Sequence, residues 1–312
     1  MTDLFYILVF PGFVFLSFAA LWAEWIDRKV YARLQNRVGP PWFQPMADFI
    51  KLLAKEDIIP TEANATFFKV SPILALTAAI TAFLYIPIWG PSSLYSFNGD
   101  IIVILYLLTI PTLCFFIGGW YSTSLYCRLG AVRTVTQLFA YEVPLLMGML
   151  APAILADTWS LSGITAFYTQ HPWYWLINLI GFGVSLVAVH GKLEKTPFDI
   201  PEAETEIVAG GFTEYSGRLL ALFRLTIDIE LVVASSLLAI VFMPFGLHFG
   251  PLIGFFLYLA KIVFLIILFS LARTVFARLR IDQMIDFCWK YLVPLALLQL
   301  LINILLKGIL PL

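Results

Sequence analysis

The sequence predicts an all-α integral membrane protein with about eight transmembrane helices. Of the 312 residues, 61% are hydrophobic and 12% are charged, and the mean hydropathy is +0.92. A soluble core does not require so apolar a chain, whereas each helix that crosses a bilayer requires about 20 mostly apolar residues. The charges gather in a few segments between long apolar runs, so we expect one membrane domain over residues 1–312.

Eight apolar runs are long enough to cross the bilayer. The predicted spans are residues 4–23, 70–89, 101–121, 134–155, 172–190, 219–245, 251–271 and 291–310. The first run has no cationic segment before it and no small-residue cleavage site after it, as a removable signal peptide would have. We therefore expect it to be retained as the first helix.

Lysine and arginine are distributed unequally between the two sides that these spans define. The loops after the first, third, fifth and seventh spans contain basic residues, whereas the loops after the second, fourth and sixth spans contain none. Because basic loops stay on the cytoplasmic side, we expect these polar loops to be cytoplasmic and both termini to lie outside the plasma membrane. The net charge of −1 gives no reason to expect a nucleic-acid partner.

The first inner loop contains a second kind of helix. Residues 45–56 begin with a proline, which suits a first helical turn, and repeat apolar residues at helical spacing. The apolar positions are Met46, Phe49, Ile50 and Leu53. This segment is too short to span, so we expect an amphipathic helix along the membrane interface, with an ordinary surface helix as the alternative.

A turn precedes this amphipathic helix. The sequence NRVGPP places Arg37 beside Gly39 and Pro40, a combination typical of a tight turn. A cation held in such a turn suits docking to an acidic surface of a partner protein.

The third inner loop concentrates negative charge. Residues 194–215 read EKTPFDIPEAETEIVAGGFTEY, and the carboxylates beyond its first residue are Asp199, Glu202, Glu204, Glu206 and Glu214. Crowded carboxylates oppose one another's ionisation, so such a cluster can hold and pass protons near neutral pH. The alternative is a solvated acidic loop. Two prolines and the Gly210–Gly211 pair favour a loop with a defined shape.

Four ionisable side chains fall inside the predicted spans: Glu142, Asp228, Glu230 and Lys261. A charge at the centre of a bilayer costs at least about 2.5 to 3.5 kcal/mol on insertion scales, which makes each of them a functional candidate. We interpret them as a hydrated proton path that leads from the acidic loop to mid-membrane. The alternative is a static ion pair, such as Lys261 with Asp228 or Glu142, that only fixes helix packing.

Other kinds of chemistry lack the required residues. The three cysteines are far apart and the three histidines are isolated, so we expect no metal, haem or iron–sulfur cluster in this chain. The sequence contains no Walker or dinucleotide fingerprint and no constellation for covalent catalysis. We expect no redox centre and no catalytic residue of its own.

Two long segments carry a family resemblance. Residues 24–60, EWIDRKVYARLQNRVGPPWFQPMADFIKLLAKEDIIP, and residues 195–217, KTPFDIPEAETEIVAGGFTEYSG, resemble the signature regions of the H subunit of respiratory complex I and its hydrogenase relatives. The eight-span layout agrees with that family over the rest of the chain. The resemblance implies a membrane anchor beneath a hydrophilic redox arm, within an oxidoreductase complex that translocates ions.

The resemblance also implies partners and roles for residues. The partners would be an iron–sulfur small subunit, a large catalytic subunit, antiporter-like and small membrane subunits, and the lipid bilayer. Arg37, Gly39 and Pro40 would shape the docking face, and the five carboxylates of residues 199–214 would form the coupling loop. Glu142 would belong to the adjoining proton path. The iron–sulfur clusters, and a NiFe centre where one exists, would lie in the partner subunits.

Two departures from the family pattern bear on the electron acceptor. Quinone-reducing members continue TEYSG into a run like FALFFLAEY, whereas this chain reads RLLALFRLTIDIELVV, and Asp27 stands where a glutamate is common. These changes favour the branch of membrane-bound NiFe hydrogenases and ferredoxin-dependent sulfur reductases over a quinone site. The alternatives are the quinone-chamber subunit of an NADH- or deazaflavin-type quinone oxidoreductase, and, from another class, a stand-alone secondary transporter.

Overall fold

The computed structural model describes residues 2–88, 90, 92–171, 173–246 and 250–309. Within these residues, eight helical segments are long and apolar enough to cross a membrane, which confirms the predicted fold class. The helices are α1 Thr2–Leu8, α2 Phe13–Leu34, α3 Gln44–Leu53, α4 Ala65–Leu84, α5 Asp100–Trp120, α6 Leu125–Ala156, α7 Leu161–Gln170, η1 Tyr174–Asn178, α8 Leu179–Lys192, α9 Glu204–Ile207, η2 Gly210–Phe212, α10 Gly217–Phe242, α11 Pro251–Val275, α12 Ile281–Phe287, η3 Cys288–Leu292 and α13 Val293–Ile309.

The helix boundaries differ most from the predicted spans in the first and last helices. The first span is interrupted around Pro11, and α2 then continues to Leu34, well beyond the apolar run. The last span begins at Ile281, ten residues before the predicted start at Tyr291. The prediction from apolar runs missed these extensions because they contain polar residues. A helix can continue through the headgroup region, where apolar residues are no longer required.

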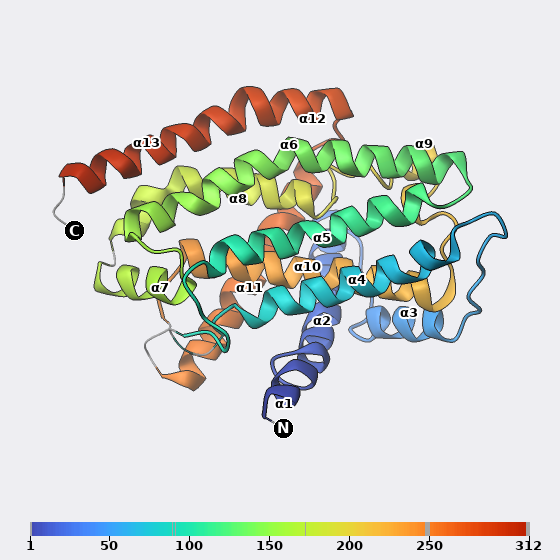
Figure 1. Ribbon diagram of the computed structural model, residues 1–312, viewed down its shortest axis with the longest axis horizontal. Coiled ribbons are helices and arrows are strands. Elements are labelled where there is room, and N and C mark those ends of the chain that lie inside the picture. The colour runs from blue at the N-terminus through green and yellow to red at the C-terminus, as the bar shows by residue number, and fades with distance from the viewer. Residues whose placement is uncertain (1, 89, 91, 172, 247–249, 310–312) are drawn as a thin grey trace.

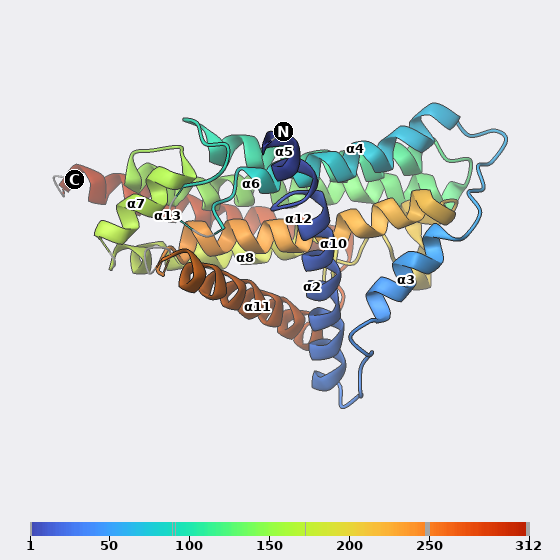
Figure 2. The same ribbon diagram turned by 90° about the horizontal axis from the view of Figure 1, so that it is seen from below.

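The helices form a bundle with α10 in its interior. From Leu225 onwards α10 is buried almost continuously, and it packs against α2, α4 and α11. Figure 2 shows α2 crossing α10 at a steep angle, with α3 beside α2 and below the right-hand part of α10. Figure 1 places α3 and α9 at one end of the molecule and α7 at the opposite end. We call the end that contains α3, α9 and residues 193–216 the charged end.

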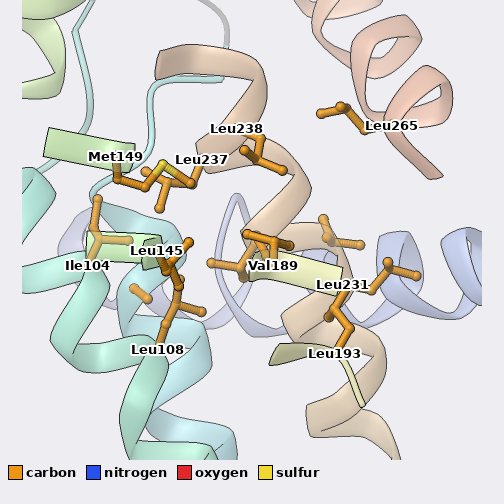
Figure 3. Packing of buried hydrophobic residues seen from close by; sticks show 14 of the residues in the cluster. Ile104, Leu108, Leu145, Met149, Val189, Leu193, Leu231, Leu237, Leu238 and Leu265 are labelled. Carbon is orange, nitrogen blue, oxygen red and sulfur yellow. The ribbon is translucent and has the colours of Figure 1, made fainter. Parts of the chain in front are cut away.

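The core is a continuous layer of aliphatic side chains between α5, α6, α8, α10 and α11. Figure 3 shows Ile104 and Leu145 on one side, Val189 in the middle, and Leu231 and Leu265 on the other. In a bilayer the lipid is as apolar as these side chains, so close van der Waals packing holds the helices together more than exclusion of water does.

A smaller aromatic core lies at the charged end. The ring of Tyr215 stacks on Phe68 with centroids 3.9 Å apart, and its hydroxyl donates to the Phe68 carbonyl at 3.2 Å. Phe115, Phe212 and Phe223 complete this cluster. The cluster fixes the end of the acidic loop against α4, α5 and α10.

Helix α3 has apolar residues on more than one face. Pro45, Phe49 and Leu52 face a cavity in the protein, whereas Ile50 and Leu53 are exposed. Of the predicted apolar positions, Phe49 therefore faces the protein, whereas Ile50 and Leu53 face outwards. The exposed apolar side chains of Ile50 and Leu53 suit a helix that lies at the membrane interface.

Candidate functional site

A charged cavity opens between α2, α3, α10 and the loop that follows α8. Its volume is about 580 Å³. Its ionisable lining residues are the carboxylates Glu24, Asp48, Glu194, Asp199, Glu202, Asp228 and Glu230 and the cations Arg28, Lys192, Lys195, Arg224, Arg273 and Arg278. Such a cavity favours water over an apolar ligand, because unpaired charges are costly to remove from water.

The acidic loop on one side of this cavity has a fixed shape. The side chain of Gln137 on α6 is fully buried, and its Nε2 donates to the carbonyls of Gly191 at 2.7 Å and Phe198 at 2.9 Å. Gly210 has a φ of +53°, and a side chain there would collide with the Pro201 carbonyl. The loop is therefore anchored to α6, and its sharp turn requires glycine.

Arginines from three different elements hold the acidic residues of this loop. Arg133 on α6 pairs with Glu206 at 2.7 Å, and Arg224 on α10 pairs with Glu202 at 3.1 Å. Arg278, after α11, donates to the backbone carbonyl of Asp199. The hydrogen bond and charge of Arg133 lower the pKa of Glu206. These contacts argue against the alternative of a freely solvated acidic loop.

The predicted coupling residues do not all reach the cavity. Asp199 and Glu202 line it, and exposed Glu206 lies outside it on Arg133. Glu214 lies beside Cys127 near the start of α6. The side chain of Glu204 lies outside the described part of the structure.

Asp27 forms the centre of an ion cluster that the sequence did not reveal. Its side chain is fully buried and accepts hydrogen bonds from Lys195 at 2.6 Å and Ser270 at 2.6 Å. Arg273 approaches the same carboxylate at 3.3 Å. Burial acts to lower the pKa of Lys195, but the charges of Asp27 and Glu24 outweigh it and raise that pKa. The cluster joins α2, α11 and the loop after α8.

A second buried ion pair lies deeper in the cavity wall. The Nζ atom of Lys192 donates to Glu230 Oε1 at 2.7 Å, to the Leu108 carbonyl at 2.5 Å and to Thr112 Oγ1 at 3.3 Å. The side chains of the pair are only 2% and 3% exposed. Thr112 Oγ1 in turn lies 3.3 Å from the hydroxyl of Tyr141 on α6. Polar contacts therefore run from the cavity to α6.

Glu142 lies next to this chain of contacts. Among the described residues, its buried Oε2 atom has no hydrogen-bond partner, and Lys192 is the cation whose charge acts on it. Asp228 lines the cavity about one helical turn from Arg224. At the mouth, burial and the nearby Glu202 and Glu230 raise the pKa of Glu194 well above its ordinary value. Glu194 therefore ionises less readily than an ordinary glutamate.

Lys261 occupies a different part of the molecule. Its ammonium group donates to the carbonyls of Met243 at 2.6 Å and of Phe245, and it lies 4.5 Å from the centre of the Phe245 ring. The alternative of a static pair with Asp228 or Glu142 is wrong. Lys261 instead satisfies carbonyl groups that the end of α10 leaves without helical partners.

The predicted docking residues lie on the surface after α2. Arg37 is exposed, and the φ of Gly39 is +76°. A side chain on Gly39 would press against Lys29 and Ala32, so the turn requires glycine. The Pro40 carbonyl accepts a long hydrogen bond of 3.5 Å from Lys29 Nζ. This turn presents a cation beside exposed Val38 and Trp42.

The residues that sequence reasoning missed share one property. They lie beyond the predicted apolar spans or at their edges, where charges are ordinary: Asp27 follows the first apolar run, and Lys192, Glu194 and Lys195 follow the fifth. The sequence held one signal for Asp27. Apolar residues at helical spacing continue past the predicted end of the first span, so Asp27 could have been placed inside a longer helix.

Comparison with known proteins gives a consistent result. A model of the NADH dehydrogenase family matches residues 6–304. The chain is 35% identical over 315 residues to the H subunit of the NADH-quinone oxidoreductase of Carboxydothermus hydrogenoformans, covering 97% of this chain and 89% of that protein. It is 37% identical over 305 residues to the corresponding protein of Dehalococcoides mccartyi strain CBDB1, which has the same name, covering 96% and 85%.

A solved structure supports the same relationship. The fold matches a chain of the membrane-bound sulfane sulfur reductase, an archaeal respiratory membrane complex, with a TM-score of 0.83 and 26% sequence identity. The match covers 93% of this chain and 96% of that chain.

Proposed function

Since this chain belongs to the NADH dehydrogenase family and is a multi-pass membrane subunit of a complex I-like respiratory complex, we propose that it is the anchor and proton-path subunit of that complex. The soluble redox subunits would dock on its charged end. The relatives are subunits of multi-subunit respiratory complexes, which argues against the alternative of a stand-alone transporter.

One observation carries this proposal. From the charged cavity, polar contacts continue through buried Glu230, Lys192 and Thr112 to Tyr141, the residue before Glu142 on α6. A charge pair that is removed from water in this way is costly and is retained mainly where ionisable groups have a function. Water in the cavity would supply protons to Glu194 and Asp228, and the buried pair would pass the change on to Glu142.

The charged end has the properties of a docking face. It carries the loop in which arginines pair with Glu202 and Glu206, and the turn before α3 adds exposed Arg37 and Trp42. A shift in charge in a partner subunit would compete for the arginines of this loop and so alter the protonation of the cavity. We place this end in the cytoplasm and both termini outside, as the basic residues indicate.

We propose that the complex belongs to the branch of hydrogenases and sulfur reductases, in which electrons do not pass to a quinone. The structural match to a sulfane sulfur reductase and the charges at Arg224 and Asp228 support this assignment. Ferredoxin would be oxidised by iron–sulfur subunits of the soluble arm, and this chain would contribute no redox centre.

A quinone chamber is the second candidate. The two curated relatives belong to NADH-quinone oxidoreductases, which favours it. The lining fits a quinone less well, because Arg28, Asp228 and Glu230 would face an isoprenoid chain with their charges. Solvent extraction of the purified complex distinguishes the two candidates. A stoichiometric quinone supports the chamber, and its absence together with insensitivity to quinone-site inhibitors supports a member of the hydrogenase and sulfur-reductase branch.

The proton-path role is tested by Glu142→Gln in the intact complex. We expect proton uptake by inverted membrane vesicles to be lost while electron transfer through the soluble arm continues. Asp286→Asn is the matched control, because Asp286 forms an exposed surface pair with Lys290. Normal proton uptake in Glu142→Gln would contradict the proposed function.

A further inference from the structure

The charge of the Lys192 ammonium group acts on two buried carboxylates, and the ammonium is hydrogen-bonded to one of them. Glu230 holds it at 2.7 Å, whereas Glu142 has a buried oxygen without a hydrogen-bond partner among the described residues. Both carboxylates interact electrostatically with Lys192. Glu194 is the third carboxylate whose charge acts on it. The charge of Lys192 therefore acts on three carboxylates, and among the described residues only Glu230 forms an ion pair with it.

The other two contacts of Lys192 allow it to move. Its remaining donors go to a main-chain carbonyl, Leu108, and to a hydroxyl, Thr112, and neither of these groups carries a net charge. A lysine side chain has four rotatable methylene groups and a compact charge that can reorient. Of the three contacts, only the one with Glu230 depends on the charge of its partner.

From this arrangement we propose that Lys192 is a positioning residue that switches between Glu230 and Glu142 and so couples the protonation of one to that of the other. This inference rests on the proposed proton-path function. When a proton from the cavity binds a carboxylate oxygen of Glu230, an O–H bond forms and the pair loses its negative member. The ammonium group then stabilises Glu142 as its O–H bond breaks and its proton passes to neighbouring water, and the pair with Glu230 returns when Glu230 transfers its proton to the ionised Glu142.

The physical basis is the strength of charge interactions in a dry environment. Coulomb attraction at a few ångströms is many times stronger in a protein interior than in water, so an ammonium follows the ionised carboxylate. Thr112 and Tyr141 line the route on the α5 and α6 sides. Asp27, although buried, already binds Lys195 and Arg273, so it has cations of its own.

The test uses the double variant Lys192→Met/Glu230→Gln in the intact complex, because either single change leaves an unpaired buried charge and is expected to impair assembly. Proton uptake is measured with a pH-sensitive dye in inverted vesicles, beside oxidation of reduced ferredoxin and the amount of assembled complex. We expect normal assembly and electron transfer with proton uptake reduced on the order of a hundredfold, the low end of what a positioned proton-transfer group contributes.

Two comparisons make the outcome decisive. The control is Lys290→Met/Asp286→Asn, which removes a lysine–carboxylate pair that is more than half exposed and should leave the ratio of protons to electrons unchanged. If the Lys192/Glu230 double variant assembles and pumps normally while Glu142→Gln does not pump, the switch is overturned and the proposed function stands. If Glu142→Gln also pumps normally, both fail.

Discussion

Lys195, in the loop after α8, donates a hydrogen bond to the buried carboxylate of Asp27 on α2 at 2.6 Å, across 168 positions of sequence. Ser270 on α11 donates to the other oxygen of the same carboxylate at 2.6 Å. The start of the acidic loop is thereby tied to two helices that cross each other in Figure 2. This one carboxylate therefore joins three elements that contribute residues to the charged cavity.

Asp27→Asn should destabilise the protein strongly. The amide keeps the shape of the side chain but leaves Lys195 and Arg273 without their common counter-charge, and breaking a buried pair costs about 3 to 5 kcal/mol. The measurement is the thermal midpoint of the purified complex in detergent. Asp286→Asn, in the exposed pair with Lys290, should change it little. Equal midpoints for the two variants would contradict the structural role of Asp27.

Gln137→Leu should loosen the acidic loop without disturbing α6. The leucine removes the side-chain donor to the carbonyls of Gly191 and Phe198, which keep backbone donors from Glu194 and Ile200, so each lost hydrogen bond should cost about 1 kcal/mol. Hydrogen exchange or limited proteolysis of residues 193–216 should therefore become faster. Gln170→Leu, at an exposed position, serves as the control. Unchanged protection of the loop would show that Gln137 does not hold it.

Glu194 should make stability dependent on pH. Burial and two neighbouring carboxylates raise its folded-state pKa above the ordinary value of 4.5. A raised folded-state pKa means that protonated Glu194 favours the folded state, fully below about pH 4.5 and progressively less as the pH rises through the folded-state pKa. Glu194→Gln cannot ionise, so its stability should fall less with rising pH than that of the wild type.

This prediction is checked by thermal midpoints measured between about pH 5 and about pH 9, inside the range where carboxyl groups with raised pKa values titrate. Exposed Glu62→Gln is the control and should follow the wild type. If the curves of the wild type and Glu194→Gln run parallel, the raised pKa is wrong.

Lys261→Met should lower the stability of α10's last turn. Methionine fills similar space but donates no hydrogen bond to the carbonyls of Met243 and Phe245, which then lie in a largely apolar setting. We expect a lower thermal midpoint than in Lys290→Met, whose ammonium lies at the surface. Proton uptake per assembled complex then tests whether Lys261 belongs to the predicted proton path. Loss of proton uptake would support that role, and normal uptake would show that Lys261 only stabilises the end of α10.

Asn303→Leu should release α13 from the bundle. Asn303 and Gln299 lie one turn apart, both fully buried, and Asn303 donates to the Ala151 carbonyl and to the side chain of Asn178 at 2.7 Å each. Polar contacts between membrane helices are worth about 0.6 to 2 kcal/mol each. Hydrogen exchange in residues 293–309 should increase, whereas exposed Asn98→Leu should not change it.

Much of the site could be anticipated from local pattern. Asp199, Glu202, Asp228 and Glu230 stand out by their charge in an apolar chain, and all four line the charged cavity. Lys192 does not stand out, because a lysine at a helix end resembles any other residue of a basic inner loop. Its burial becomes visible only when α5 and α10 are placed around it.

The sequence by itself determined that this chain has eight membrane spans, which loops carry the charge, and to which family it belongs, because hydropathy, basic residues and long motifs are local properties of the chain. Only the tertiary structure decided which charges meet. Asp27 finds Lys195, Lys192 finds Glu230, and Lys261 finds carbonyls instead of a carboxylate. These choices depend on how each helix is rotated and how steeply it crosses its neighbours, which packing between distant segments sets.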